Sequence, residues 1–537
     1  MHAQIRWVSN QLNKVDIKLL IFLVLLLNVK LLVKVLAIVL IYALKPDFKF
    51  GFSIKNSRIT LLFPFLILLA LINAVTFNLF EKPGYWLVFV TGSGFWIACL
   101  LVSHQARLFA EENRDKVFHT LQVFFILNAL VSLAVLVGIM WETGSINPYT
   151  YQGDFQKYFI GTGDYIKGIS FDTSTANAAI NAFGVFLFLE KKKWSMLLLC
   201  LGCLLLTGSN LVNFLLLICL LFLFIFRSGR EQKSIIILCM LPMIIFWARV
   251  SPQNNNYITS AYKKVLNPDQ PGQPKEKEIP IIERPDTLLT AEQKKEKIVT
   301  IYLDSVRKEL SSRLKQGDGL ASTAFIAAEE KPLVPVANIH TPQYQHKDDT
   351  NETRKEWMQF AVQKGINREE IIQNKWPGKI VALAQTADYL KKNPAHLITG
   401  AGMGNFSSRL AFKASALDIA GYYPSGHAYI HPAFQENHLA LYLSFFTKKE
   451  GLHSVINTPH SVFAQMAGEY GLAGLAGFFV FYIMFFAKRH RELSYGLPLL
   501  LFMTGMFFTE YWFEQLSIVF LFELLMNLNQ NESGKHA

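Results

Sequence analysis

The chain alternates long apolar runs with short charged segments. About 17–25 apolar residues cross a bilayer as a helix, and ten runs approach this pattern: 59–79, 85–103, 118–141, 174–190, 194–209, 211–226, 233–249, 461–487, 495–511 and 515–530. The segment 17–44 is also apolar, but Lys30 and Lys34 interrupt it, so it forms either one long tilted helix or two short helices that turn near Asn28. The pattern predicts an all-α polytopic membrane protein with 11–12 transmembrane helices.

A long polar insert separates the apolar runs into two blocks. The three regions are a transmembrane block at 1–249, an insert at 250–458 and a second transmembrane block at 459–537. The insert opens with an irregular Pro- and Gln-rich linker at 251–290. Apolar residues at helical spacing then predict helices over 291–316 and 377–392. We expect the insert to be mainly helical and irregular.

Lysine and arginine gather in the short loops. Five loops are basic: Lys45, Lys49, Lys55 and Arg58; Arg107, Arg114 and Lys116; Lys191, Lys192 and Lys193; Arg227, Arg230 and Lys233; Lys488, Arg489 and Arg491. Strict alternation of the spans puts all five on one side, and short basic loops stay in the cytoplasm. The large insert then lies on the extracytoplasmic side. This bias accounts for the formal net charge of +12, which therefore does not call for a nucleic-acid partner.

Composition supports the membrane assignment. Hydrophobic residues make up 52% of the chain and the mean hydropathy is +0.27, too apolar for an ordinary soluble enzyme of this length. All five cysteines lie in apolar spans, so the insert folds without disulfides. Cys200 and Cys203 form a C-x-x-C among leucines, which favours two small apolar residues over a redox or metal pair.

The strongest chemical candidate is His460, which lies where the polar insert meets the span 461–487. Imidazole exchanges protons near neutral pH, so a histidine at this boundary suits a general base. Glu469 follows nine residues later, on roughly the opposite face of a continuous helix. We therefore expect Glu469 to pin a neighbouring helix and not to orient His460.

Other polar residues occur within or beside the spans, where they are costly and often functional. They are Asn177, Asn181, Asn210, Asn213, Glu469, Glu510 and Glu514. Hydrogen bonding between helices is the simpler interpretation for most of the asparagines. His427 and His431 are four residues apart, but their Gly and Pro neighbours favour loop histidines over a metal site.

Two features of the extracytoplasmic side suit a phosphate. The turn around Gly400, Gly402 and Gly404 can expose successive backbone amides, although a plain tight turn fits the same residues. Lys167 and Lys379 lie near the membrane, where a lysine either clamps a diphosphate or extends its ammonium towards water.

The order of these segments resembles the O-antigen ligase and polymerase superfamily of bacterial membrane glycosyltransferases. The resemblance spans roughly 160–525, and the matching residues are Lys167-Gly168, Thr175-Ala176-Asn177, Thr207-Gly208-Ser209-Asn210, Pro394, Gly400, Gly402, Phe406, His460-Ser461, Glu469, Gly471, Gly474 and the tail 509–522. Lys167 and Asn210 replace family arginines, and Arg354, Lys375 and Lys379 are alternative matches for the loop arginine.

The resemblance implies a GT-C-like fold in the bacterial inner membrane with a periplasmic insert. It implies transfer of a saccharide from undecaprenyl diphosphate to lipid A–core, in lipopolysaccharide biosynthesis, without a metal or cofactor. His460 would be catalytic. The diphosphate or glycan would contact Lys167, Lys379, Arg354, Gly400, Gly402 and Gly404. Glu469, Asn177 and Glu514 would support the site.

Several alternatives remain open at the level of sequence. A polysaccharide polymerase and a protein O-oligosaccharyltransferase share the scaffold and differ in the acceptor, which is a glycan or a protein. A polysaccharide transporter or flippase and a receptor with a ligand-binding loop are alternatives of other classes. A transporter is expected to carry paired ionisable groups near the bilayer midplane or repeat symmetry.

Overall fold

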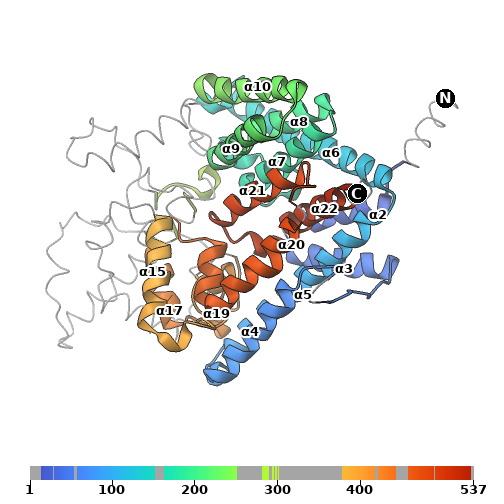
Figure 1. Cartoon of the computed structure of the whole chain (residues 1–537). Coiled ribbons are helices and arrows are strands. Elements are labelled where there is room, and N and C mark those ends of the chain that lie inside the picture. Colours follow the sequence, from blue (N-terminus) through green and yellow to red (C-terminus); the bar gives the residue numbers. More distant parts are fainter. Residues whose placement is uncertain are drawn as a thin grey trace.

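The computed structural model of the chain is mainly helical in the residues it describes (Figure 1). These residues are 14–27, 30–53, 57–151, 162–250, 281–289, 293–294, 297–298, 300–301, 378–417, 421–442, 458–488 and 490–533. Within these ranges there are helices, turns and irregular segments and no strands. The expected all-α fold is therefore confirmed for the described part of the chain. Most of the predicted helix 291–316 lies outside it.

The first block contains nine helices in the described residues. They are α2 (Ile17–Leu27), α3 (Leu31–Leu44), α4 (Leu62–Thr76), α5 (Tyr85–Ala110), α6 (Arg114–Thr143), α7 (Ser174–Glu190), α8 (Trp194–Leu206), α9 (Asn210–Phe226) and α10 (Arg230–Ile245). The segment 17–44 forms two short helices, and α2 and α3 pack against each other. This resolves the two alternatives that its central lysines left open.

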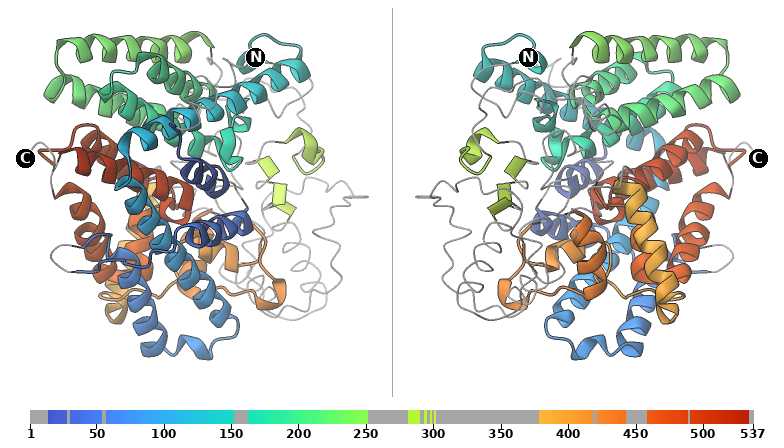
Figure 2. Two further views of the ribbon diagram at one scale, coloured as in Figure 1. Left: turned by 90° about the vertical axis from the view of Figure 1, so that its right-hand side faces the viewer. Right: turned by 90° about the vertical axis from the view of Figure 1, so that its left-hand side faces the viewer.

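The later helices include the predicted helix 377–392, which is confirmed as α15. They are α15 (Gly378–Lys392), α16 (Arg409–Ala414), α17 (Pro432–Phe434), α19 (Val462–Phe478), α20 (Met484–Ala487), α21 (Gly496–Phe507) and α22 (Leu516–Ser533). A π-helical turn at Phe479–Ile483 joins α19 to α20. Figure 2 shows the chain from two further sides.

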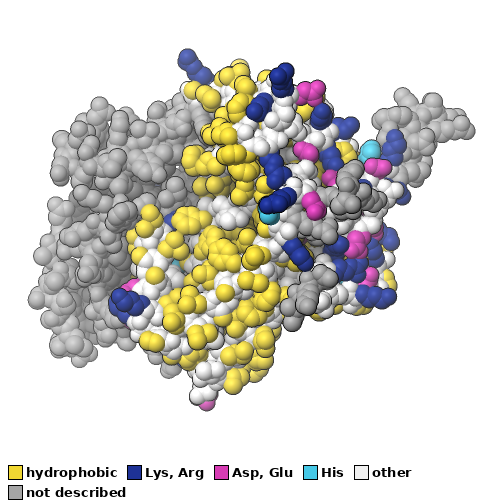
Figure 3. Space-filling model, in the orientation of Figure 1, with side chains coloured by type: hydrophobic (Ala, Val, Ile, Leu, Met, Phe, Trp, Pro, Cys, Tyr) yellow, Lys and Arg dark blue, Asp and Glu magenta, His cyan; other side chains and the backbone are white. Residues whose placement is uncertain are grey.

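Four helices are long and apolar enough to cross a membrane: Tyr85–Ala110, Arg114–Thr143, Arg230–Val250 and Val462–Ala487. Six further apolar helices are shorter, with 10–17 residues. Large apolar side chains face outward from the long helices, among them Leu130 and Val137 of α6. In Figure 3 hydrophobic side chains cover the middle of the molecule. The chain is thus a multi-pass membrane protein.

The centre of the bundle is α22, which packs against α2, α5, α7 and α21. Its residues are apolar on every side from Leu516 to Leu525 apart from Ser517 and Glu523, and almost all of them are buried. Phe522 contacts the rings of Phe183 in α7, Tyr482 in the π-helical turn and Phe486 in α20. A helix that is apolar all round is expected to be surrounded by others, and α22 fulfils this.

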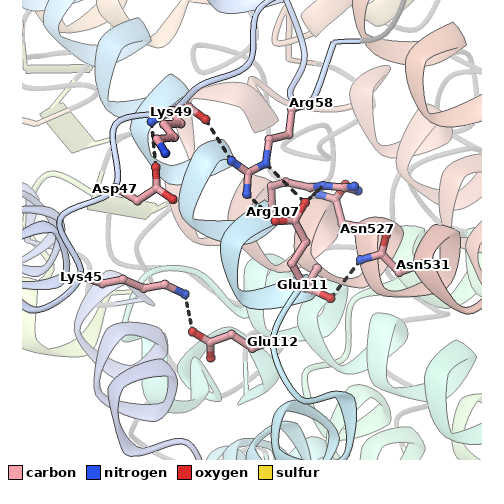
Figure 4. Close-up of polar contacts among 10 residues, drawn as sticks. Lys45, Asp47, Lys49, Arg58, Arg107, Glu111, Glu112, Asn527 and Asn531 are labelled. Carbon is pink, nitrogen blue, oxygen red and sulfur yellow. Dashed lines mark hydrogen bonds and ion pairs between the residues drawn. The ribbon is translucent and has the colours of Figure 1, made fainter.

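Charged side chains join the helix ends on one face of the bundle. Lys45 binds Glu112, Arg58 and Arg107 bind Glu111, Lys191 binds Glu532 and Lys192 binds Glu231. Figure 4 shows part of this network, with Asn527 and Asn531 of α22 beside the α5 end. In Figure 3 the Lys and Arg side chains gather along the edge away from α15. The basic loops thus lie together on one face, as alternation of the spans predicts.

Candidate functional site

His460 and Glu510 meet at the ends of two apolar helices on the α15 side of the bundle. His460 lies two residues before α19, and Glu510 lies shortly after the end of α21. His460 Nδ1 is 3.0 Å from Glu510 Oε1, and the two side chains are 14% and 29% exposed. The pair is therefore partly accessible, and the carboxylate fixes which imidazole nitrogen carries a proton towards it.

Three aromatic rings surround the His460 imidazole. Tyr442 stacks on it with ring centroids 5.3 Å apart and an interplanar angle of 18°. Phe412 and Tyr511 lie with their centroids 5.1 and 5.0 Å from it. These contacts and the bond to Glu510 restrict rotation of the ring, as a proton-transferring group requires.

Lys379 is buried against the backbone of the segments that carry this pair. It is 3% exposed, and its ammonium donates to Thr458 Oγ1 at 3.2 Å, to the carbonyl of Thr509 at 2.5 Å and to the carbonyl of His460. An ammonium has three N–H donors, so the protein already uses all of them. The diphosphate contact expected of Lys379 has no donor left in this arrangement.

The glycine-rich turn surrounds a carboxylate of the protein itself. Backbone amides of Gly404, Phe406 and Ser407 bind the Glu469 carboxylate, the Ser407 amide at 3.3 Å from Oε1. The Ser408 hydroxyl donates to the same oxygen at 2.6 Å. Consecutive amides form an anion-binding concavity, and Glu469 occupies this one. Glu469 thus holds the turn, whereas the sequence led us to expect that it pins a helix.

The same turn exchanges backbone hydrogen bonds with a break in α19. Gly471 has φ 67° and ψ −164°, which interrupts the helix. The freed groups pair across the break: Ala401 N binds Gly468 O at 2.9 Å, and Leu472 N binds Leu397 O at 2.9 Å. Segments 397–402 and 468–473 therefore form one interlocked unit. Only glycine fits such backbone approach at this φ.

A second carboxylate, Glu514, positions the start of α16. Glu514 Oε1 accepts from the Arg409 amide at 2.9 Å and from Gln465 Nε2 at 2.9 Å. Ser408 caps the same helix by accepting from the Ala411 amide at 3.0 Å. Glu469 and Glu514 thus hold consecutive parts of the segment 404–411.

Cationic side chains gather near this end of α16. Lys34 of α3 is 6% exposed, and Asp172 and Arg409 are close enough to act on it electrostatically. Lys413 lies one turn after Arg409 on α16; burial lowers the pKa of Lys413, the Arg409 charge lowers it further and Glu514 opposes the shift. Phe412, between them, contacts His460. Two of these cations, Arg409 and Lys413, therefore lie on the helix that contacts His460.

Lys167 and Asn177 belong to a second polar cluster at the start of α7. Thr173 caps α7 by accepting from the Ala176 amide at 3.1 Å. The side chain of Asn177 then receives a 2.9 Å bond from Asn128 and donates to the Ile166 carbonyl at 2.9 Å. These bonds fix the turn that carries Lys167, so Asn177 acts as a structural anchor for it.

The sequence identified His460 but not its partner. Glu510 appeared only among the polar residues near spans, and the signal that could have marked it was its place at the membrane boundary on the same side as His460. Lys34 was noted as an interruption of an apolar run, and Arg409 gave no sequence signal. Arg354 lies outside the described residues.

The site contains no candidate metal centre among the residues that the structure describes, where no three His, Cys, Asp or Glu side chains gather. What the arrangement offers is a histidine with a carboxylate partner, close to the cationic helix α16, at the ends of apolar helices. Comparison of the chain with protein-family models, curated proteins and solved structures finds no match.

Proposed function

We propose that this chain is a membrane glycosyltransferase of the O-antigen ligase type. It transfers a saccharide from undecaprenyl diphosphate to a hydroxyl of lipid A–core at the extracytoplasmic face of the bacterial inner membrane. The observation that carries the proposal is the His460–Glu510 pair, 3.0 Å apart at the ends of apolar helices. A donor with a polyprenyl tail and a polar head presents its reacting carbon at such a boundary.

The proposed chemistry uses the imidazole as a base. Glu510 occupies Nδ1, so Nε2 takes the proton from the acceptor hydroxyl, and the carboxylate stabilises the imidazolium that results. The acceptor oxygen forms a bond to the anomeric carbon while the bond from that carbon to the diphosphate oxygen breaks. The electron pair leaves on the diphosphate, whose growing charge is stabilised by nearby cations.

Lys34, Arg409 and Lys413 are the cations best placed for that role. Lys34 is buried in a helix of the membrane block with Arg409 near it. Ionisable groups in such helices are costly and mark functional sites. We assign the diphosphate to these three side chains, with Lys167 as a further contact at the α7 end, in place of Lys379.

The proposed topology uses twelve crossings, of which four are helices long enough to cross a membrane in the described residues. The nine helices α2 to α10, the continuous pair α19 and α20, then α21 and α22 give twelve crossings in the described residues if each spans the bilayer. With the basic face in the cytoplasm, His460, Glu510 and α15 lie outside. This supports a periplasmic site.

The decisive experiment is turnover by the purified protein in detergent. We expect the wild-type protein to transfer glycan from an undecaprenyl-diphosphate donor to lipid A–core, and the His460→Ala variant to lose activity by about 10²–10⁴-fold, the contribution of a general base. His490→Ala is the matched control, since His490 is exposed on the basic face. Wild-type activity in His460→Ala would exclude the assignment. Product on another glycan or on a protein would select the polymerase or protein-glycosylating alternative.

A further prediction concerns the donor. Lys34→Met removes one cation and keeps the hydrocarbon stem, so the KM for the donor is expected to rise about tenfold or more, the loss of one charge-assisted hydrogen bond. Lys30→Met, one turn earlier and exposed, is the control. Steady-state kinetics against donor concentration measures both. An unchanged KM in Lys34→Met would remove Lys34 from the diphosphate site.

A transporter of lipid-linked glycan is the second candidate. The observation that favours it is Glu523, a carboxyl that is 2% exposed within α22. A carboxyl at such depth is typical of transport pathways. Movement of a labelled donor across vesicles without any transferred product would favour this alternative over the glycosyltransferase.

A further inference from the structure

Lys379 joins two chain segments that meet at the candidate site. Its ammonium contacts Thr458 and His460, which precede α19, and Thr509, which follows α21. Two of these acceptors lie on the backbone of the pair: the carbonyl of His460 itself, and the carbonyl of Thr509, the residue before Glu510. A single buried side chain from α15 therefore binds the backbone on both sides of the His460–Glu510 pair.

The helix that carries Lys379 is itself fixed to the same region. One turn after Lys379, the Ala382 carbonyl accepts from His438 Nε2 at 3.1 Å, and Thr386 contacts the same nitrogen at 3.2 Å. His438 Nδ1 accepts from the Ser407 hydroxyl at 2.6 Å, and that hydroxyl lies 2.9 Å from the Tyr511 hydroxyl. His438 and Ser407 are fully buried. Lys379 thus acts from a rigid support.

We propose that Lys379 is a positioning residue. Its ammonium binds the backbone of both segments and so keeps the side chains of His460 and Glu510 within hydrogen-bonding distance of each other. It touches neither donor nor acceptor. The effect of Lys379 on turnover rests on the proposed function. Its effect on the geometry of the His460–Glu510 pair does not depend on that function. The charged form is the one that suits three oxygen acceptors, since a neutral amine has two N–H donors.

Two opposing effects set the charge of Lys379. Burial lowers the pKa of Lys379 to about 7, and the Glu510 carboxylate opposes the shift. Glu510 therefore favours the ammonium that holds its own segment. A lysine that instead bound a diphosphate would need an N–H directed away from these backbone groups, and the three bonds leave none.

The first test needs no substrate. Diethyl pyrocarbonate modifies accessible neutral imidazoles, and mass spectrometry of peptides gives the rate at each histidine. In Lys379→Met we expect His460 to react about tenfold faster than in the wild type, the factor that corresponds to one lost hydrogen bond from a charged donor. His438 is expected to stay protected, which shows that the variant is folded. Equal His460 rates in the two proteins would overturn the proposal.

Lys297→Met is the matched control. Lys297 is 7% exposed and its ammonium also binds the protein, at 2.7 Å from the Arg284 carbonyl and 2.8 Å from Asp286. Loss of a buried ammonium there is expected to leave the His460 rate unchanged. If Lys379→Met fails to fold, Thr458→Val removes one acceptor alone, and a smaller increase in the His460 rate is expected; no increase would overturn the proposal.

The second test is kinetic and separates this role from donor binding. Lys379→Met is expected to lower kcat about 10–100-fold, since misplacement of reacting groups is costly, and to leave the donor KM unchanged. A raised donor KM with unchanged kcat would overturn the proposal in favour of direct diphosphate contact. If the wild type transfers no glycan but Lys379→Met still exposes His460, the proposed function fails and the positioning role stands.

Discussion

The Glu510→Gln variant is expected to lose about 10²–10⁴-fold in turnover, because the carboxylate that orients the His460 imidazole and stabilises its protonated form is replaced by a neutral amide. Glutamine keeps the size of the side chain, so the protein should fold as before. Glu510 Oε1 lies 3.0 Å from His460 Nδ1, so the carboxylate acts directly on the proposed base. We therefore expect a larger loss of turnover here than at any other residue that does not touch the substrate. Initial rates of glycan transfer measure it.

When two residues act together in one catalytic step, the losses of rate from their separate substitutions do not add. This allows a stricter test of the Glu510 prediction. The double variant His460→Ala/Glu510→Gln should be no slower than His460→Ala alone. Asp388→Asn serves as the control, since Asp388 is an exposed carboxylate of α15 that pairs with Lys392 at 2.6 Å and such pairs contribute little. If the two substitutions multiply, or if Glu510→Gln transfers glycan at the wild-type rate, Glu510 does not serve His460.

Gly471→Ala is expected to destabilise the protein by about 3–5 kcal/mol, the sum of a strained backbone and an overpacked contact. Gly471 has φ +67°, and a Cβ there would lie 2.3 Å from the Ile398 carbonyl oxygen. Gly400→Ala is expected to act in the same way, since its Cβ would lie 2.4 Å from the Glu469 carbonyl carbon. Thermal unfolding in detergent should show a clearly lower midpoint for both.

Gly202→Ala provides the comparison for the glycine variants. Gly202 lies within α8, and a Cβ there meets nothing within 4 Å. Alanine in a helix interior is favoured over glycine by about 0.5–1 kcal/mol, so this variant should unfold at an equal or higher temperature. Were Gly471→Ala as stable as Gly202→Ala, the segments 397–402 and 468–473 would not be interlocked as described.

The membrane helices were predictable from sequence because their signal is local. A helix in lipid must be apolar over its own length. Segments such as 118–141 and 461–487 can therefore be recognised from their own residues alone. The division of 17–44 into α2 and α3 was one of two readings, since Lys30 and Lys34 interrupt the apolar run in either case. The break at Gly471 was not foreseen, because it depends on backbone groups from residues 397–402.

The candidate site was only partly predictable, because its members come together across long stretches of chain. His460 stands out by its boundary position. Glu510 lies fifty residues later in the sequence, and no spacing rule connects the two. The amides around Gly404 were a reasonable prediction for an anion site. That the anion is Glu469 could not be known without the fold. Similarly, Lys379 was predicted to be a cation near the site, but the sequence could not show which groups its ammonium contacts.

The position of α22 at the centre of the bundle has a consequence for biosynthesis. During translation α22 emerges after all the other described helices. Yet Asn527 and Glu532 accept from Arg107 and Lys191, and Asn531 donates to the Ala110 carbonyl, all on segments made long before. Until α22 is made, the ends of the earlier helices lack these three contacts. A nascent chain that stops short of α22 would therefore present exposed polar and basic groups to membrane quality-control proteases, so that only chains extending through α22 reach a protease-resistant state.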